Sequence, residues 1–206
     1  MNKPRFLFSI TAFFFICLLS FSTSFAQTET KQQAEPVYEI VLQTLAASNN
    51  QSEKTGVPPS LANVLKKLKT DYSFNNYRLT STYIQRIANT GGVEFKSVSS
   101  EVNQNQDNYA PVFSEWSLGG LRNFPSSKGQ NSIQFQNFRF GQRVPIKTAN
   151  YTGESGKLSS VVNYEQIGLT LNRFGLTENM PTVIGSLSTA NGEIMFLVLT
   201  VKPINE

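Results

Sequence analysis

The chain has 206 residues, of which 39% are hydrophobic and 16% are charged, and its formal net charge is +4. This length suits one compact domain or two small ones, and the sequence shows no basic stripe of the kind that binds duplex nucleic acid. The absence of His excludes Ser-His-Asp and Cys-His catalytic groups and His-ligated zinc.

The first 26 residues have the layout of a secretory signal. A short basic end precedes an apolar run from Phe6 to Phe21, and small residues lead up to Ala26, where a signal peptidase is expected to cut. An uncleaved membrane anchor is the alternative, because the run approaches spanning length. A lipid anchor on Cys17, the only Cys, is disfavoured by the bulky residues before it. We therefore expect export, followed by folding without disulfides around an ordinary core.

The first elements after this signal are a leader, a strand and a helix. Residues 27–36 are polar and are expected to form a flexible leader, whereas residues 37–45 are rich in β-branched and apolar types, which is typical of a strand. A helix is predicted over residues 60–70, with Ser60 as its N-cap, because four apolar residues recur at i, i+3, i+4 and i+7. These four residues are Leu61, Val64, Leu65 and Leu68.

The next part of the chain predicts a hairpin. Residues 77–87 and 93–98 alternate in polarity, and Asn89-Thr90-Gly91-Gly92 between them is typical of a tight turn. Residues 37–98 therefore predict a small strand–helix–hairpin module. The polar residues 99–108 would form a linker or long loop after it.

From residue 109 to residue 206 the pattern is almost wholly β. A parity shift at Gln136-Asn137 predicts a bulge that keeps four apolar side chains on one face, those of Ile133, Phe135, Phe138 and Phe140. Residues 182–188 and 193–202 flank Asn191-Gly192, which is a strong hairpin signal. The expected fold class is therefore α+β, with the small module followed by a mostly antiparallel β domain.

Catalysis by this chain would depend on carboxylates, Lys, Tyr or Ser, because it has no His and no Cys beyond the signal. Its acids are dispersed along the sequence and lie on no recognisable motif, so we interpret them as solvated surface groups. A carboxylate-dependent hydrolase is the enzymatic alternative, since acids that are distant in sequence can meet in space. We expect no enzyme activity, no catalytic residues, no cofactor and no metal site.

Four aromatic residues favour a second hypothesis, which is ligand recognition. Tyr109, Phe113, Trp116 and Phe124 lie near one another in sequence and would form a platform for a glycan or a peptide. Aromatic residues at this density in a β protein more often belong to the core. On the recognition hypothesis, the chain is a periplasmic or secreted β-rich module that binds through these side chains.

Four segments of the second half follow one another in the order found in a known family. They are Phe140–Pro145, Val162–Leu171, Pro181–Leu187 and Ile194–Ile204. They resemble the G-Q-x-V-P, V-x-Y-x-x-V-G-L-x-L, T-V-V-I-G-G-L and L-x-I-L-V-T-P-x-I segments of bacterial secretins, the outer-membrane rings of secretion and pilus systems. The residues singled out from this resemblance are Gly141, Gln142, Val144, Pro145, Gly168, Gly185 and Pro203.

The resemblance implies an exported, soluble, secretin-like envelope protein with a structural or assembly role in a secretion or pilus-type system. Its expected partners are envelope or secretion-system proteins and further copies of the chain, and not nucleic acid. Secretins carry membrane-inserted hairpins where this chain has only Asn172–Met180, which is too short for a pair of spanning strands. The mature form is therefore expected in the periplasm or associated with the outer membrane, without a direct membrane span.

Overall fold

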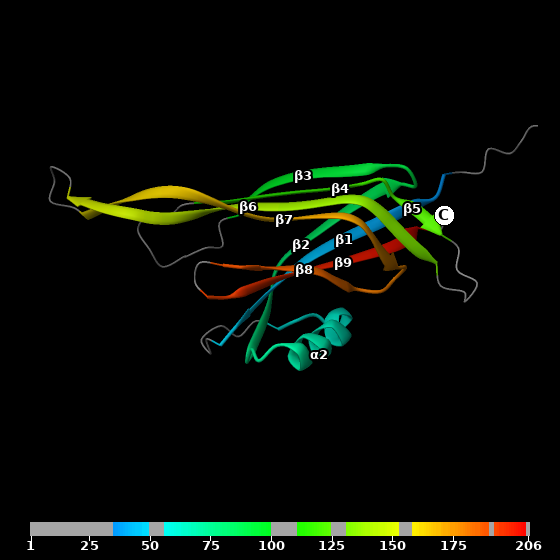
Figure 1. Ribbon diagram of the computed structural model, residues 1–206, viewed down its shortest axis with the longest axis horizontal. Helices are drawn as coiled ribbons and strands as arrows, with labels where there is room; N and C mark the ends of the chain where they lie inside the picture. Colours follow the sequence, from blue (N-terminus) through cyan, green and yellow to red (C-terminus); the bar gives the residue numbers. More distant parts are fainter. Residues whose placement is uncertain are drawn as a thin grey trace, which may run out of the picture. The chain divides into compact units, whose positions relative to one another are not determined.

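The structure is a computed structural model, and it describes residues 35–49, 56–99, 111–124, 131–152, 158–189 and 192–204. These residues belong to one compact unit, Glu35–Glu206. In the described ranges the chain forms nine strands, one α-helix and one 3-10 turn (Figure 1). All strand pairs are antiparallel, and they form two sheets.

The first sheet brings the two ends of the unit together. Its strands lie in the order β2 (Asn76–Ala88), β1 (Val37–Ser48), β9 (Ile194–Ile204) and β8 (Thr182–Ser188). β1 and β9 lie at the centre, and most residues of each are buried. The continuous apolar run Met195–Leu199 is buried throughout, as predicted for a strand that is covered on both faces.

The second sheet contains the remaining strands. They are β3 (Gly92–Ser99), β4 (Val112–Gly119), β5 (Arg122–Phe124), β6 (Ser132–Thr152) and β7 (Leu158–Thr177). β4 and β5 pair with successive parts of β6, and β3 lies beyond β4. β7 pairs with β6 over the whole length of both strands. β3, β5 and β7 each pair with one strand of this sheet and are therefore its edges.

The main core lies between the two sheets. It is built from alternate side chains, because successive residues of a strand point to opposite faces. The first sheet contributes Tyr38, Ile40, Leu42, Leu197 and Leu199, and the second contributes Trp116, Leu118, Phe135, Phe138 and Phe140. Each fully buried side chain of this size contributes about 2 kcal/mol of hydrophobic free energy.

At one height in the second sheet, the alternation between core-facing and solvent-facing side chains shifts by one residue. Phe135 and Phe138 are three residues apart, yet both are buried. At this height Gly120, between β4 and β5, has a φ of 69°, and Arg173 of β7 has a φ of 52°. Gln136 of β6 is skipped in the register, because Phe135 and Asn137 on either side of it pair with β7 and it does not. The irregularity returns the aromatic side chains to the inner face. The prediction that these aromatics share one face is confirmed.

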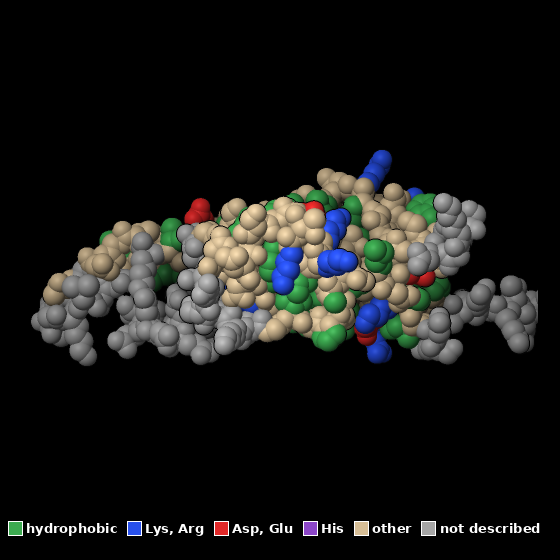
Figure 2. All heavy atoms as spheres, turned by 90° about the horizontal axis from the view of Figure 1, so that it is seen from below, with side chains coloured by type: hydrophobic (Ala, Val, Ile, Leu, Met, Phe, Trp, Pro, Cys, Tyr) green, Lys and Arg blue, Asp and Glu red, His purple; other side chains and the backbone are tan. Residues whose placement is uncertain are grey.

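The helix covers one end of the outer face of the first sheet. A 3-10 turn at Pro59–Leu61 is followed by α2 (Ala62–Asp71), and the predicted apolar stripe packs against β1, β2 and β9. Ser60 makes no capping hydrogen bond, because the prolines before it begin a 3-10 turn and the α-helix starts later. Figure 2, seen from the side of α2, shows Lys and Arg side chains as separate groups rather than one continuous patch.

The expected α+β fold class is wrong, because the described chain is mostly antiparallel β with one short helix. β1 and β2 do not share a sheet with β3; β1 pairs with β2 on one side and with β9 on the other, in the first sheet. The turn at Asn89-Thr90 leads from one sheet to the other instead of closing a hairpin. Burial decides this outcome, since Val93 and Phe95 of β3 pack on the core from the second sheet.

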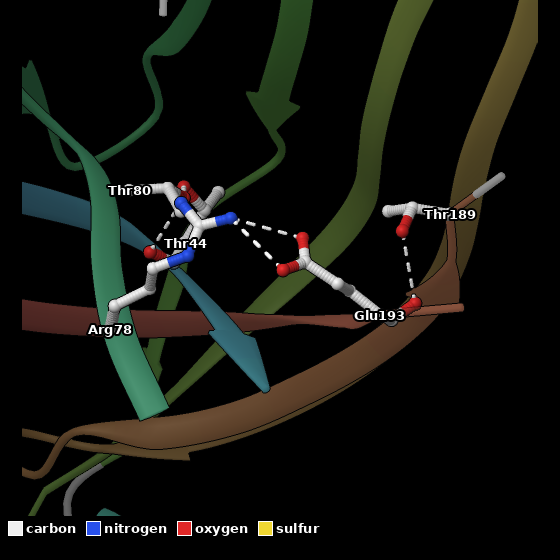
Figure 3. A network of polar contacts seen from close by, with 5 residues as sticks. All are labelled: Thr44, Arg78, Thr80, Thr189 and Glu193. Carbon is white, nitrogen blue, oxygen red and sulfur yellow. Dashed lines mark hydrogen bonds and ion pairs between the residues drawn. The ribbon is translucent and has the colours of Figure 1, made fainter. Parts of the chain in front are cut away.

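A polar network joins β2 to the start of β9 (Figure 3). Nη2 of Arg78 donates to both carboxylate oxygens of Glu193, at 3.0 and 3.2 Å. Thr80, the additional residue where β2 bulges against β1, donates to the carbonyl oxygen of Thr44 at 3.0 Å. Thr189 donates to the carbonyl oxygen of Glu193 at 3.1 Å. These contacts fix the register at one end of the first sheet.

Candidate interaction site

The second sheet extends into a two-stranded ribbon. β4 pairs with β6 only as far as the register pair Phe113 and Arg143. β6 and β7 continue beyond that pair, through Val144–Thr152 and Leu158–Glu165, and no other strand of the described residues pairs with them there. We call these two segments the ribbon, which Figure 1 shows projecting past the other strands.

The ribbon forms because its sequence is rich in residues that favour strands. Val144, Ile146, Val161, Val162 and Tyr164 are β-branched or aromatic. Exposed fractions are 40% for Val161 and 42% for Tyr164. A two-stranded hairpin is marginally stable at best in water when nothing packs on it. The ribbon is therefore a surface that a partner would stabilise.

The two faces of the ribbon differ in chemistry. Directly paired residues share a face, and neighbours along a strand lie on opposite faces. Arg143 pairs with Gln166 on the outer face, which continues the solvent side of the second sheet. Val144 pairs with Glu165 on the inner face, which continues the core side. A cation therefore lies on one face and a carboxylate on the other.

A hollow of about 200 Å³ lies on the outer face at the base of the ribbon. Gly141 lines the hollow and pairs with Gly168, and the side chains of Glu115 and Gln166 lie next to Gly141 on this face. The rings of Phe113 and Tyr164 meet edge to face at 5.6 Å, and the Arg143 guanidinium carbon lies 4.8 Å from the Phe113 ring centre. The lining also includes Lys96, Val98, Glu115, Gln142 and Gln166.

Arg143 and Glu165 have no ion-pair partner among the residues that the structure describes. Arg143 is held instead by the Phe113 ring, in a cation–π contact. Lys96 pairs with Glu94 at 3.2 Å and lies opposite Glu115 in the register of β3 and β4. That part of the sheet thus has two carboxylates for one Lys, and Glu115 lies diagonally across from Arg143 in the register of β4 and β6, although no ion pair joins the two.

The structure brings together five of the residues that carry the family resemblance. Gly141, Gln142, Val144 and Pro145 lie on β6, and Gly168 faces Gly141 from β7. The amide of Gln142 donates to the hydroxyl of Ser114 at 2.9 Å. The other two lie in the first sheet, Gly185 on β8 and Pro203 on β9. Gly185 abuts Leu169 of β7, so its lack of a side chain permits close packing of the sheets.

The proposed aromatic platform is not assembled by the described residues. Trp116 is 1% exposed and belongs to the core, whereas Phe113 lies on the opposite face of β4. Phe124 is exposed on β5 and takes no part in the hollow. Tyr109 lies outside the described residues. The alternation of β4 separates Phe113 from Trp116, because they are an odd number of residues apart.

The sequence analysis did not assign Arg143, Tyr164 or Glu165 to the site. Arg143 stands within the segment Phe140–Pro145, and the other two stand within Val162–Leu171. Both segments were thus recognised, but the pairing register decides which of these side chains share a face. Alternation in β7 alone would have placed Tyr164 and Glu165 on opposite faces.

In the parts of the chain that the structure describes, no group of three or more acidic, Cys or His side chains is arranged to hold a metal ion. None of the helices found there is long and apolar enough to cross a bilayer.

Comparisons with known proteins find weak structural similarity and no similarity in sequence. No protein-family model matches the sequence, and no curated protein matches it. Among solved structures, the chain is similar to the InvG secretin domain β-barrel of the Salmonella SPI-1 injectisome NC-base, with 9% sequence identity and a TM-score of 0.33. The match covers 84% of this chain and 64% of that chain, so this chain spans less than two thirds of its neighbour.

Proposed function

We propose that the protein is an exported, secretin-like structural component of the cell envelope that assembles with partners through its ribbon. The observation that carries the proposal is the ribbon itself, because Val144–Thr152 and Leu158–Glu165 pair with each other and with no further strand in the part of the chain that the structure describes. The signal layout of the first 26 residues supports export. The four ordered segments that resemble secretins support a role in a secretion or pilus-type system.

Physical reasons favour assembly over bond-making chemistry at this surface. The ribbon exposes the apolar side chains of Val161 and Tyr164, and a partner that covers them gains about 25 cal/mol for each Å² of apolar area buried. The open edges of the ribbon also present backbone groups to which another strand can add. A partner would thus stabilise the part of the fold that has the least support from its own sheet.

The test is site-specific photo-crosslinking in an envelope-bearing bacterial host. A photoreactive residue replaces Tyr164 in the full chain, and the matched control replaces Ile84, an apolar residue of β2 that is 57% exposed and lies in the other sheet. We expect adducts at position 164 to an envelope protein or to a second copy, and few at position 84. Protein found only in the cytoplasm, or equal crosslinking at both positions, would refute the proposal.

A further inference from the structure

We propose that the hollow on the outer face of one copy receives the inner face of the ribbon of a second copy, with Arg143 of the first paired to Glu165 of the second. The inference rests on the proposed function, because it names the partner of the same surface. It commits to a homotypic contact. A different envelope protein at this surface is therefore an outcome that would overturn it.

Arg143 is arranged as a receptor for a carboxylate. Its guanidinium is stacked on Phe113 at 4.8 Å, and Tyr164 supports that ring from the side at 5.6 Å. A planar guanidinium has five N–H donors in a fixed fork, and stacking leaves its edge free to bind a carboxylate with two hydrogen bonds. No carboxylate of the described residues occupies that edge.

Glu165 has the complementary properties on the opposite face of the same ribbon. Its side chain is exposed and meets no cation of the described chain. It lies directly opposite Val144, and Ile146 follows on the same face. The inner face therefore offers branched apolar side chains with one carboxylate. The outer face offers the Phe113 and Tyr164 rings with one cation, Arg143, that forms no ion pair with a described carboxylate.

The hollow has the composition to accept this face. Val98 and Phe113 provide apolar contact, and Gln166 provides a neutral amide beside Arg143. Glu115 is the carboxylate that opposes binding, but Lys96 faces it across the register of β3 and β4. Because Lys96 forms its ion pair with Glu94, the guanidinium of Arg143 is the cation of this lining that makes no ion pair with a described carboxylate.

The proposed contact is heterologous, because the two faces that meet are different. Each copy uses its outer face toward one neighbour and its inner face toward the next. Such a contact continues from copy to copy until it closes into a ring or grows as a filament. The assembly therefore needs both Arg143 and Glu165 on every copy, unless complementary variants are mixed.

Charge reversal tests the contact. The full chain is purified as wild type, Arg143→Glu and Glu165→Arg, and association is measured by sedimentation velocity and native mass spectrometry over a concentration series. Each single variant places like charges in contact, so we expect its association to weaken by about tenfold or more. An equimolar mixture of the two variants restores opposite charges at every contact between unlike copies. We therefore expect the mixture to associate like the wild type.

Arg122→Glu is the matched control, because it reverses an exposed cation of β5 that does not line the hollow. We expect it to associate like the wild type. Arg143→Gln and Glu165→Gln serve as milder variants if a reversal prevents folding, which circular dichroism reports; each should weaken association, and a double variant should not recover it.

The outcomes separate the inference from the proposed function. If the wild type assembles and the reversals have no effect, or if mixing does not restore association, the Arg143–Glu165 contact is overturned while an assembly role stands. If the wild type stays monomeric at every concentration, the homotypic contact is overturned as well. The proposed function then depends on whether position 164 crosslinks to another envelope protein.

Discussion

At the scale of single residues, Tyr77 joins the helix to the first sheet. Its hydroxyl donates to the carbonyl oxygen of Leu68 at 3.1 Å, in the small core between α2 and the sheet. Burial raises the pKa of Tyr77 above its ordinary value of 10.0, and the nearby Tyr72 adds to the shift. The folded state therefore holds the Tyr77 proton more tightly than the unfolded state does.

This shift predicts an alkaline loss of stability. A group with a raised folded-state pKa contributes stability below its unfolded value and loses it as the pH rises toward the folded value. Tyr77→Phe should cost about 1 kcal/mol at neutral pH, because it deletes the hydrogen bond. It should also reduce the fall in stability from about pH 9 to about pH 11.

Urea unfolding at a series of pH values measures both effects. Tyr164→Phe is the control, since it removes an exposed hydroxyl of the ribbon. A Tyr77→Phe profile that stays parallel to the wild type above about pH 10 would contradict the assignment.

Substitutions at Gly120 and Gly192 would distinguish the cost of a positive φ from the cost of a steric clash. Both have a positive φ, 69° and 79°, which disfavours any residue with a Cβ. A Cβ at position 120 would also lie 2.6 Å from the Cβ of Gln136, whereas position 192 has open space. Gly192→Ala should therefore cost about 1 kcal/mol, and Gly120→Ala about 3 kcal/mol or more. If the two variants lose the same amount of stability in thermal or urea unfolding, the Gln136 side chain does not constrain the backbone at Gly120.

At the scale of elements, β6 and β7 are each divided into a supported part and an unsupported part. Phe138–Arg143 has β4 on one side and β7 on the other. Val144–Thr152 pairs with β7 and with no other strand of the described residues. Local stability follows the number of buried contacts and of protected hydrogen bonds, so these two segments of one strand should open with very different free energies.

Amide hydrogen exchange measures this division. In the monomer, we expect amides of Val144–Thr152 to exchange about 100-fold faster than those of Phe138–Arg143. Amides of β9, the centre of the first sheet, serve as the slow reference. Assembly through the ribbon should slow the first group and leave the second unchanged. Equal protection of both segments in the monomer would show that the ribbon is stable without a partner.

At the scale of the whole molecule, both sheets combine strands from both halves of the sequence. β1 lies between β2 and β9 in the first sheet, and β3 pairs with β4 in the second. Every central strand of the first sheet therefore depends on a partner that is distant in the chain. Long-range pairing of this kind joins the strands into one cooperative unit.

A truncated chain tests that dependence. Residues 109–206 alone contain β9 without β1, and they expose side chains of β9 such as Leu197 and Leu199 that are fully buried in the whole unit. We expect this fragment to show no cooperative thermal transition, whereas residues 35–206 should show one. A cooperative transition of the fragment in circular dichroism would instead support an independent second domain, as the sequence analysis expected.

The sequence by itself determined the features that depend on neighbours along the chain. The apolar stripe of Leu61, Val64 and Leu68 predicts a helix face, and that face is buried. The Asn191-Gly192 signal predicts that β8 and β9 pair, and they do. Such features follow from local periodicity and turn chemistry, which a short segment contains in full.

Only the tertiary structure decided which strands share a sheet and which side chains share a surface. Asn89-Thr90 has the sequence of a hairpin turn, yet β2 and β3 enter different sheets because β1 obtains its two neighbours from β2 and β9. Phe113 and Arg143 meet because the register of β4 and β6 places them opposite each other. Strand pairing is set by the burial of the whole core and not by adjacent residues, so the hollow and the two faces of the ribbon have no local signal.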